Sequence, residues 1–65
     1  MKRILEFQCE GKPTDNEIEE AIEMTSDGYQ IHLYYEVFDY TYKIVVNQGD
    51  TFADVKSRIP KIYGG

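Results

Sequence analysis

Three segments of the chain alternate apolar and polar residues, which is the spacing of a β-strand with one buried face. In the first segment, RILEFQC, the residues Leu5, Phe7 and Cys9 share one face. In the second, residues 29–38, and the third, residues 40–47, every second position, counted from Tyr29 and from Tyr40, is apolar or aromatic. The pattern therefore predicts three strands, each with an inward and an outward face.

The second and third segments are expected to form a hairpin. A two-residue turn at Asp39 and Tyr40 would place inward residues opposite each other as Val37 and Tyr42, Tyr35 and Ile44, and Leu33 and Val46. The same register opposes outward residues as Glu36 and Lys43, Tyr34 and Val45, and His32 and Asn47. The opposite charges of Glu36 and Lys43 favour this register by roughly 0.2–1 kcal/mol. Because the turn lacks the Gly or Asn that tight hairpins prefer, a four-residue loop is the alternative.

A helix is predicted between the first two strands. Thr14, with Glu17 three residues later, forms a capping box, in which each side chain accepts a hydrogen bond from the other residue's backbone N–H. Gly28 is expected to end the helix, because glycine readily adopts the left-handed conformation that closes many helices. The inner side of the helix consists of Ile18, Ala21, Ile22 and Thr25.

A second helix is predicted in the segment QGDTFADVKSRI, with Asp50 or Thr51 as its N-cap. Its apolar stripe consists of Phe52, Val55 and Ile59. Pro60 stops or kinks this helix, so residues 60–65 form a C-terminal tail.

The order of elements, β-α-β-β-α, predicts an α+β fold in one small domain of residues 1–65. A three-stranded sheet with both helices packed on one face would bury every inward set of side chains. A chain of 65 residues buries only about 60% of the surface of its unfolded form. Such chains often need a disulfide, a metal or a partner subunit. With one Cys and one His, self-association is the expected support.

The hairpin and the segment GDTFADVKSRI, together with the terminal Gly64 and Gly65, resemble the strand-strand-helix unit that opens ubiquitin-like β-grasp proteins. The resemblance covers about half of the chain. Here a strand and a helix precede the hairpin, and the two glycines follow a helix rather than a further strand. The resemblance implies a ubiquitin-like modifier that acts through its terminal glycines.

Acidic side chains are concentrated in one part of the chain. The net charge is −5, and between Pro13 and Tyr42 the chain carries eight Asp and Glu but no Lys or Arg. This charge argues against direct binding of nucleic acid. The first helix carries Asp15, Glu17, Glu19, Glu20 and Glu23 on its outside.

Like charges at helical spacings of three and four cost roughly 0.2–0.5 kcal/mol a pair, so helix stability alone would favour some lysines there. One interpretation is a merely solvated face. The other is a surface that docks on the basic surface of a partner protein. In one form of this interpretation, the row of carboxylates imitates the phosphates of a nucleic acid.

The outward face of the sheet is more apolar than a face exposed to water normally is. It carries Ile4, His32, Tyr34, Phe38 and Val45. Exposed patches of this kind mark interfaces, and Tyr is a frequent hot-spot residue. We therefore expect a homodimer or a higher homo-oligomer formed through this face or through an edge strand. The alternative is that Ile62 and Tyr63 of the tail cover part of it.

No pattern in the chain predicts catalysis or a cofactor. Cys9 is expected to face inward as a small hydrophobe, and His32 lies on the opposite face of the sheet. The helical carboxylates lack the Gly-containing turn of a calcium loop, and the chain has no glycine-rich phosphate loop. We therefore expect no enzymatic activity, no cofactor and no metal.

The segment MKRILEFQC lacks the apolar run of ~7–15 residues that a secretory signal needs. No apolar run approaches the ~20 residues of a membrane span, so we expect a soluble, cytoplasmic protein with no membrane partner. The leading hypothesis is a small acidic interaction protein, in the manner of phage and mobile-element accessory proteins, that binds a basic partner through the first helix and self-associates. The alternatives are a structural or assembly subunit with apolar self-contacts, and the ubiquitin-like modifier.

Overall fold

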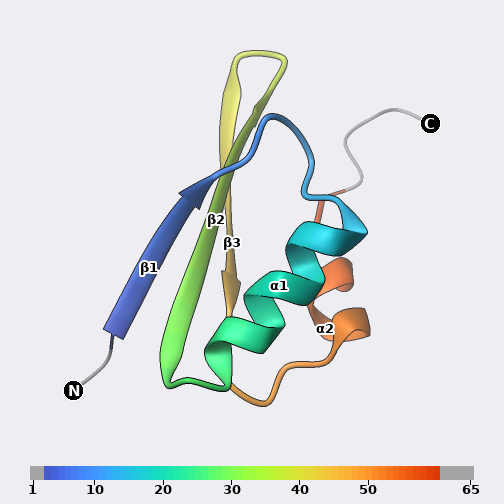
Figure 1. Cartoon of the computed structure of the whole chain (residues 1–65). Helices are drawn as coiled ribbons and strands as arrows, with labels where there is room; N and C mark the ends of the chain where they lie inside the picture. Colours follow the sequence, from blue (N-terminus) through green and yellow to red (C-terminus); the bar gives the residue numbers. More distant parts are fainter. Residues whose placement is uncertain (1–2, 61–65) are drawn as a thin grey trace.

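The computed structural model describes residues 3–60 and contains the five predicted elements in the predicted order (Figure 1). The strands and helices are β1 (Arg3–Gln8), α1 (Asp15–Thr25), β2 (Tyr29–Val37), β3 (Tyr40–Val46) and α2 (Phe52–Ser57). The strands form one mixed sheet in the order β1-β2-β3, with β1 parallel and β3 antiparallel to β2. Both helices lie on one face of this sheet, so the predicted α+β fold is confirmed. Most of the predicted tail, including Ile62, Tyr63, Gly64 and Gly65, lies outside the described residues.

Helix α1 begins with the predicted capping box. The backbone N–H of Glu17 donates to Thr14 Oγ1 at 3.2 Å, and the backbone N–H of Thr14 donates to Glu17 Oε1 at 2.8 Å. After α1 ends, the chain turns at Gly28, whose φ of 95° is easily reached by glycine. The buried residues of the helix are Ile18, Ala21 and Thr25, and Ile22 is half-buried, so the predicted inner side is confirmed.

Helix α2 is capped by Thr51 rather than by Asp50. Thr51 and Asp54 form a second capping box, with N–H to side-chain oxygen distances of 3.1 and 3.0 Å. The carboxylate of Asp50 instead accepts a hydrogen bond from the backbone N–H of Asn47 at 2.7 Å and pairs with Arg58. Asp50 therefore fixes the loop between β3 and α2.

The core lies between the two helices and the inward face of the sheet. Its buried apolar residues are Cys9, Ile18, Ala21, Ile31, Leu33, Tyr35, Ile44, Val46 and Val55. The ring of Tyr35 stacks on that of Tyr42, with centroids 5.3 Å apart and planes inclined by 22°. Strands β2 and β3 and both helices contribute buried residues to this cluster. Strand β1 packs against it through Leu5, and Cys9, which follows β1, belongs to it.

The predicted hairpin register is wrong by two residues. Val37 pairs with Tyr40, Glu36 with Thr41, Tyr35 with Tyr42, Tyr34 with Lys43, Leu33 with Ile44, and His32 with Val45. The turn consists of Phe38 and Asp39, whose φ angles of 51° and 68° are those of a type I′ turn. Because a shift of two residues preserves the two-residue period, each strand keeps its predicted faces although every predicted pair changes.

Strand β1 forms one edge of the sheet and is not covered by α1. No Cα atom of α1 lies within 8 Å of a Cα atom of β1, and α1 packs over β2 and β3 instead. Phe7 faces inward, since it pairs with the buried Leu33, yet 39% of its surface is exposed. The expectation that the inward side chains of this segment are buried therefore holds for Cys9, which follows β1, but not for Phe7, and Leu5 is half-buried.

Candidate functional site

The five predicted acidic residues of α1, Asp15, Glu17, Glu19, Glu20 and Glu23, which we call the acidic row, fall into two groups. Asp15 and Glu17 have partners within the chain. Asp15 Oδ1 lies 2.9 Å from Lys56 Nζ of α2, and Glu17 closes the capping box. Both carboxylates also lie in the first turn of α1, where the helix dipole favours negative charge. These two residues therefore stabilise the fold.

The other three members of the acidic row, Glu19, Glu20 and Glu23, are exposed. The salt bridges recorded within residues 3–60, Asp15–Lys56 and Asp50–Arg58, involve none of them. The last turn of α1 contains no basic residue, and there Glu23 lies near the negative end of the helix dipole. These three carboxylates thus do little for the stability of α1.

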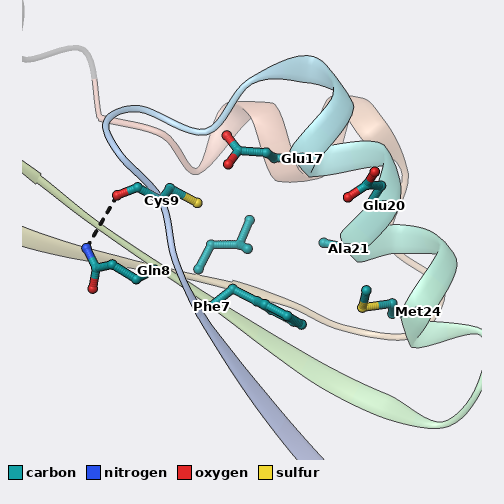
Figure 2. A pocket seen from close by; sticks show the side chains of 8 residues that line it. Phe7, Gln8, Cys9, Glu17, Glu20, Ala21 and Met24 are labelled. Carbon is teal, nitrogen blue, oxygen red and sulfur yellow. Dashed lines mark hydrogen bonds between the residues drawn. The ribbon is translucent and has the colours of Figure 1, made fainter.

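An open pocket with a volume of about 140 Å³ lies beside Glu20, between α1 and β1 (Figure 2). It is lined by Phe7, Gln8, Cys9, Glu17, Glu20, Ala21, Met24 and Leu33. The pocket exists because α1 packs over β2 and β3 and leaves Phe7 on the inward face of β1 partly exposed. Figure 2 shows Phe7 and Cys9 on one side, Ala21 and Met24 on the other, and the carboxylates of Glu17 and Glu20 directed toward the space between them.

Cys9 forms an unreactive part of the pocket wall. It is 5% exposed, and its backbone N–H donates to the carbonyl of Tyr34 at 2.7 Å. Burial, followed by the negative charge of Glu17 and a hydrogen bond to it, raises the pKa of the Cys9 thiol to about 11. At neutral pH the side chain is therefore a neutral thiol, whereas nucleophilic catalysis requires the thiolate.

The outward face of the sheet brings together four of its five predicted residues, Ile4, His32, Tyr34 and Val45. Ile4 is 49% exposed, and the other three are half-buried. Phe38 does not belong to this face, because it lies in the hairpin turn, where it is 74% exposed.

Hydrogen bonds make the outward face more polar than the sequence pattern suggested. Tyr34 Oη donates to Glu6 Oε2 at 2.7 Å, and this hydrogen bond raises the pKa of Tyr34. His32 Nε2 lies 3.0 Å from Gln30 Oε1, and Gln30 Nε2 donates to Asn47 Oδ1 at 2.6 Å. The Tyr34–Glu6 and Gln30–Asn47 hydrogen bonds were not predicted, because they join neighbouring segments of the sheet and depend on the register between them.

In the part of the chain that the structure describes, no three His, Cys, Asp or Glu side chains gather closely enough to hold a metal ion. Over the same residues, neither helix has the length and apolar character needed to cross a membrane.

The comparisons with known proteins add no relative. No protein-family model, curated protein or solved structure matches this chain.

Proposed function

We propose that this chain is a small, non-enzymatic interaction protein that binds a basic surface of a partner protein through the exposed part of α1. The observation that supports this proposal is the position of Glu19, Glu20 and Glu23. The three carboxylates are exposed and lie outside the salt bridges within residues 3–60, and Glu20 also lines the pocket between α1 and β1. A partner that brings Lys or Arg side chains to this surface supplies the missing positive charge.

The spacing of the three carboxylates makes the unbound helix electrostatically unfavourable. Glu23 is four residues from Glu19 and three from Glu20, and each like-charge pair costs roughly 0.2–0.5 kcal/mol. Binding of a basic surface replaces this repulsion with attraction. The net charge of −5 also speeds the encounter with a positively charged partner at low salt. A cytoplasmic location and a role as a phage or mobile-element accessory protein belong to the same proposal and rest on composition alone.

A capture experiment with matched variants tests this proposal. The full chain is used as bait in a cell lysate at about 50 mM and about 500 mM NaCl, beside a variant carrying Glu19→Gln, Glu20→Gln and Glu23→Gln. The control variant carries Glu10→Gln, Glu36→Gln and Asp39→Asn, which removes the same amount of charge from exposed positions outside α1. We expect a protein with a basic surface that the wild type and the control retain at low salt and that the first variant loses. If every captured protein is retained equally by both variants, α1 is not the docking surface.

Open sheet edges favour self-association as a second candidate function. Within residues 3–60, β1 and β3 each pair with β2 alone, so each has a free edge that can pair with another chain. The 49% exposed Ile4 on the outward face adds apolar surface next to the edge of β1. Light scattering at about 100 µM tests this candidate, since an interface with a dissociation constant of ~1 µM is then largely occupied. A monomer at that concentration excludes it.

A further inference from the structure

We propose that the pocket between α1 and β1 binds one aromatic side chain of a basic peptide segment, with the Lys or Arg neighbours of that side chain held by Glu17 and Glu20. This inference rests on the proposed function and specifies the partner: a basic segment that carries a single aromatic residue. We call the site the anchor pocket and define its apolar walls as Phe7, Cys9, Ala21, Met24 and Leu33.

The volume of the anchor pocket suits one aromatic ring. The pocket measures about 140 Å³, close to the roughly 150 Å³ of an apolar protein cavity that accommodates benzene. The small side chain of Ala21 leaves this space open on the side of α1. Met24 offers a flexible thioether, which makes favourable contacts with aromatic rings, and the exposed ring of Phe7 offers an aromatic partner.

The charges at the rim select a basic segment. Glu17 and Glu20 are three residues apart on α1, so they lie on the same side of the helix, and Figure 2 shows both carboxylates directed toward the pocket. A segment with Lys or Arg on either side of its aromatic residue can place positive charges at this rim while the ring enters the pocket. An acidic segment is repelled.

The same charges argue against a second copy of this chain as the occupant. The most exposed aromatic residue of the described chain is Phe38 at the hairpin tip, 74% exposed. Its neighbours include Glu36 and Asp39, and no Lys or Arg is present between Pro13 and Tyr42. Insertion of this tip would bring carboxylates to a rim that is already acidic. The occupant is therefore a different, basic protein.

Two synthetic peptides separate the anchor pocket from simple charge attraction. The sequences Lys-Arg-Phe-Arg-Lys and Lys-Arg-Ala-Arg-Lys carry the same charge and differ only in the central side chain. Each is titrated into the ¹⁵N-labelled full chain at about 50 mM NaCl and followed by NMR. We expect the Phe peptide to bind at least about tenfold more tightly, with shifts at Phe7, Ala21, Met24 and Leu33, and the Ala peptide to shift residues of the acidic row alone.

A pair of variants on β1 provides the matched control. Phe7→Ala removes one wall of the anchor pocket, whereas Ile4→Ala removes an apolar side chain of comparable exposure from the opposite face of the same strand. We expect Phe7→Ala, but not Ile4→Ala, to reduce the affinity for the Phe peptide to that for the Ala peptide. If Phe7→Ala does not fold, Met24→Ala, which removes the facing wall of the anchor pocket on α1, gives the second test and should likewise reduce the affinity for the Phe peptide to that for the Ala peptide.

The possible failures are distinguishable. Equal binding of both peptides, lost at about 500 mM NaCl, overturns the anchor pocket and leaves the proposed function standing. Binding of the Phe peptide that persists in the Glu19→Gln, Glu20→Gln and Glu23→Gln variant and at high salt contradicts the proposed function and also overturns the role of Glu20 at the rim of the pocket. Absence of binding by the Phe peptide overturns the pocket. Shifts at Phe7 and Met24 that change with protein concentration, without peptide, make a second copy the occupant and also overturn the proposal.

Discussion

Lys56 Nζ of α2 lies 2.9 Å from Asp15 Oδ1 of α1. Asp15 and Glu17 of the acidic row therefore have partners within the fold. Asp15 is neutralised by a residue 41 positions later in the chain. Glu19, Glu20 and Glu23 lie outside the salt bridges recorded within residues 3–60. The excess negative charge of α1 is therefore concentrated on its last two turns, where Glu20 lines the anchor pocket.

The Asp15–Lys56 pair is expected to contribute little to stability. Its side chains are 67% and 49% exposed, and exposed ion pairs typically contribute ~0.2–1 kcal/mol. A double-mutant cycle with Asp15→Asn and Lys56→Met, followed by urea unfolding, should give a coupling energy in this range that falls as salt is raised. A coupling energy well above ~1 kcal/mol would mean that the pair is shielded from water more than the structure indicates.

The hairpin turn is expected to be a source of strain that two substitutions relieve. Phe38 and Asp39 both have positive φ, which Asn and Gly adopt at lower cost than a bulky residue. The double variant Phe38→Asn and Asp39→Gly should raise the free energy of unfolding by about 1 kcal/mol. Phe38→Ala alone, which removes the ring but keeps the strained backbone, should not raise it. Equal stability of the wild type and the Asn-Gly variant would argue against a type I′ turn here.

The faces of the elements could be predicted from the sequence, but the contacts between them could not. Inward residues such as Ile31, Ile44 and Ile18 are buried as expected, because period and capping are local properties. The hairpin register was wrong because no Gly or Asn marks the turn at Phe38 and Asp39. The apparent Glu36–Lys43 pair then favoured the wrong alignment.

The acidic half of the candidate site is visible in the sequence, whereas the apolar half is not. The run of carboxylates in α1 can be counted without a structure. The exposure of Phe7 depends on α1 lying over β2 and β3 rather than over β1. The alternation of a strand predicts the face on which Phe7 lies but not which helix packs over it. The anchor pocket depends on that packing and so could not be predicted from the sequence.

Cys9 should behave as a core residue with a poorly reactive thiol. Removal of a small buried group should make Cys9→Ala less stable than the wild type by ~1–2 kcal/mol. Because the pKa of the thiol is raised from 9.0 to about 11, native Cys9 should react slowly with iodoacetamide at pH 8 and faster as the pH approaches 11. Rapid alkylation of the folded chain at pH 8 would show that Cys9 is accessible and ionised.

The same shift predicts a loss of stability in alkali. The unfolded chain releases the Cys9 proton near pH 9.0, whereas the folded chain holds it to about pH 11. The folded state therefore binds more protons between these values, and stability falls as the pH rises through this window. Cys9→Ala should lack this part of the pH dependence. The difference in unfolding free energy between wild type and variant, measured from pH 8 to 10.5, isolates the contribution of the thiol.

Asp50 should contribute an opposite dependence in acid. Hydrogen bonding to Arg58, and then to the backbone N–H of Asn47, lowers the pKa of the Asp50 carboxyl below 3.8. A carboxyl with a lowered pKa in the folded state stabilises the protein above its unfolded pKa, and this stabilisation is lost as the pH falls below 3.8. The melting temperature of the wild type should therefore decline more steeply from pH 5 to pH 2.5 than that of Asp50→Asn. Parallel declines would exclude this pair as a source of acid sensitivity.

Replacement of Glu19 and Glu23 with Lys should separate the stability of α1 from its proposed role in binding. The change replaces the like-charge pairs of Asp15 with Glu19 and of Glu20 with Glu23 by attractive ones, and it places a positive charge at the C-terminal end of the helix dipole. The free energy of unfolding should rise by a few tenths to about 1 kcal/mol. Binding of a basic partner, or of the Lys-Arg-Phe-Arg-Lys peptide, should be lost, because positive charges then face positive charges. Melting temperature and peptide affinity measured on the same variant distinguish a role in stability from a role in binding. A variant that is more stable and still binds like the wild type leaves the acidic row with no role in recognition.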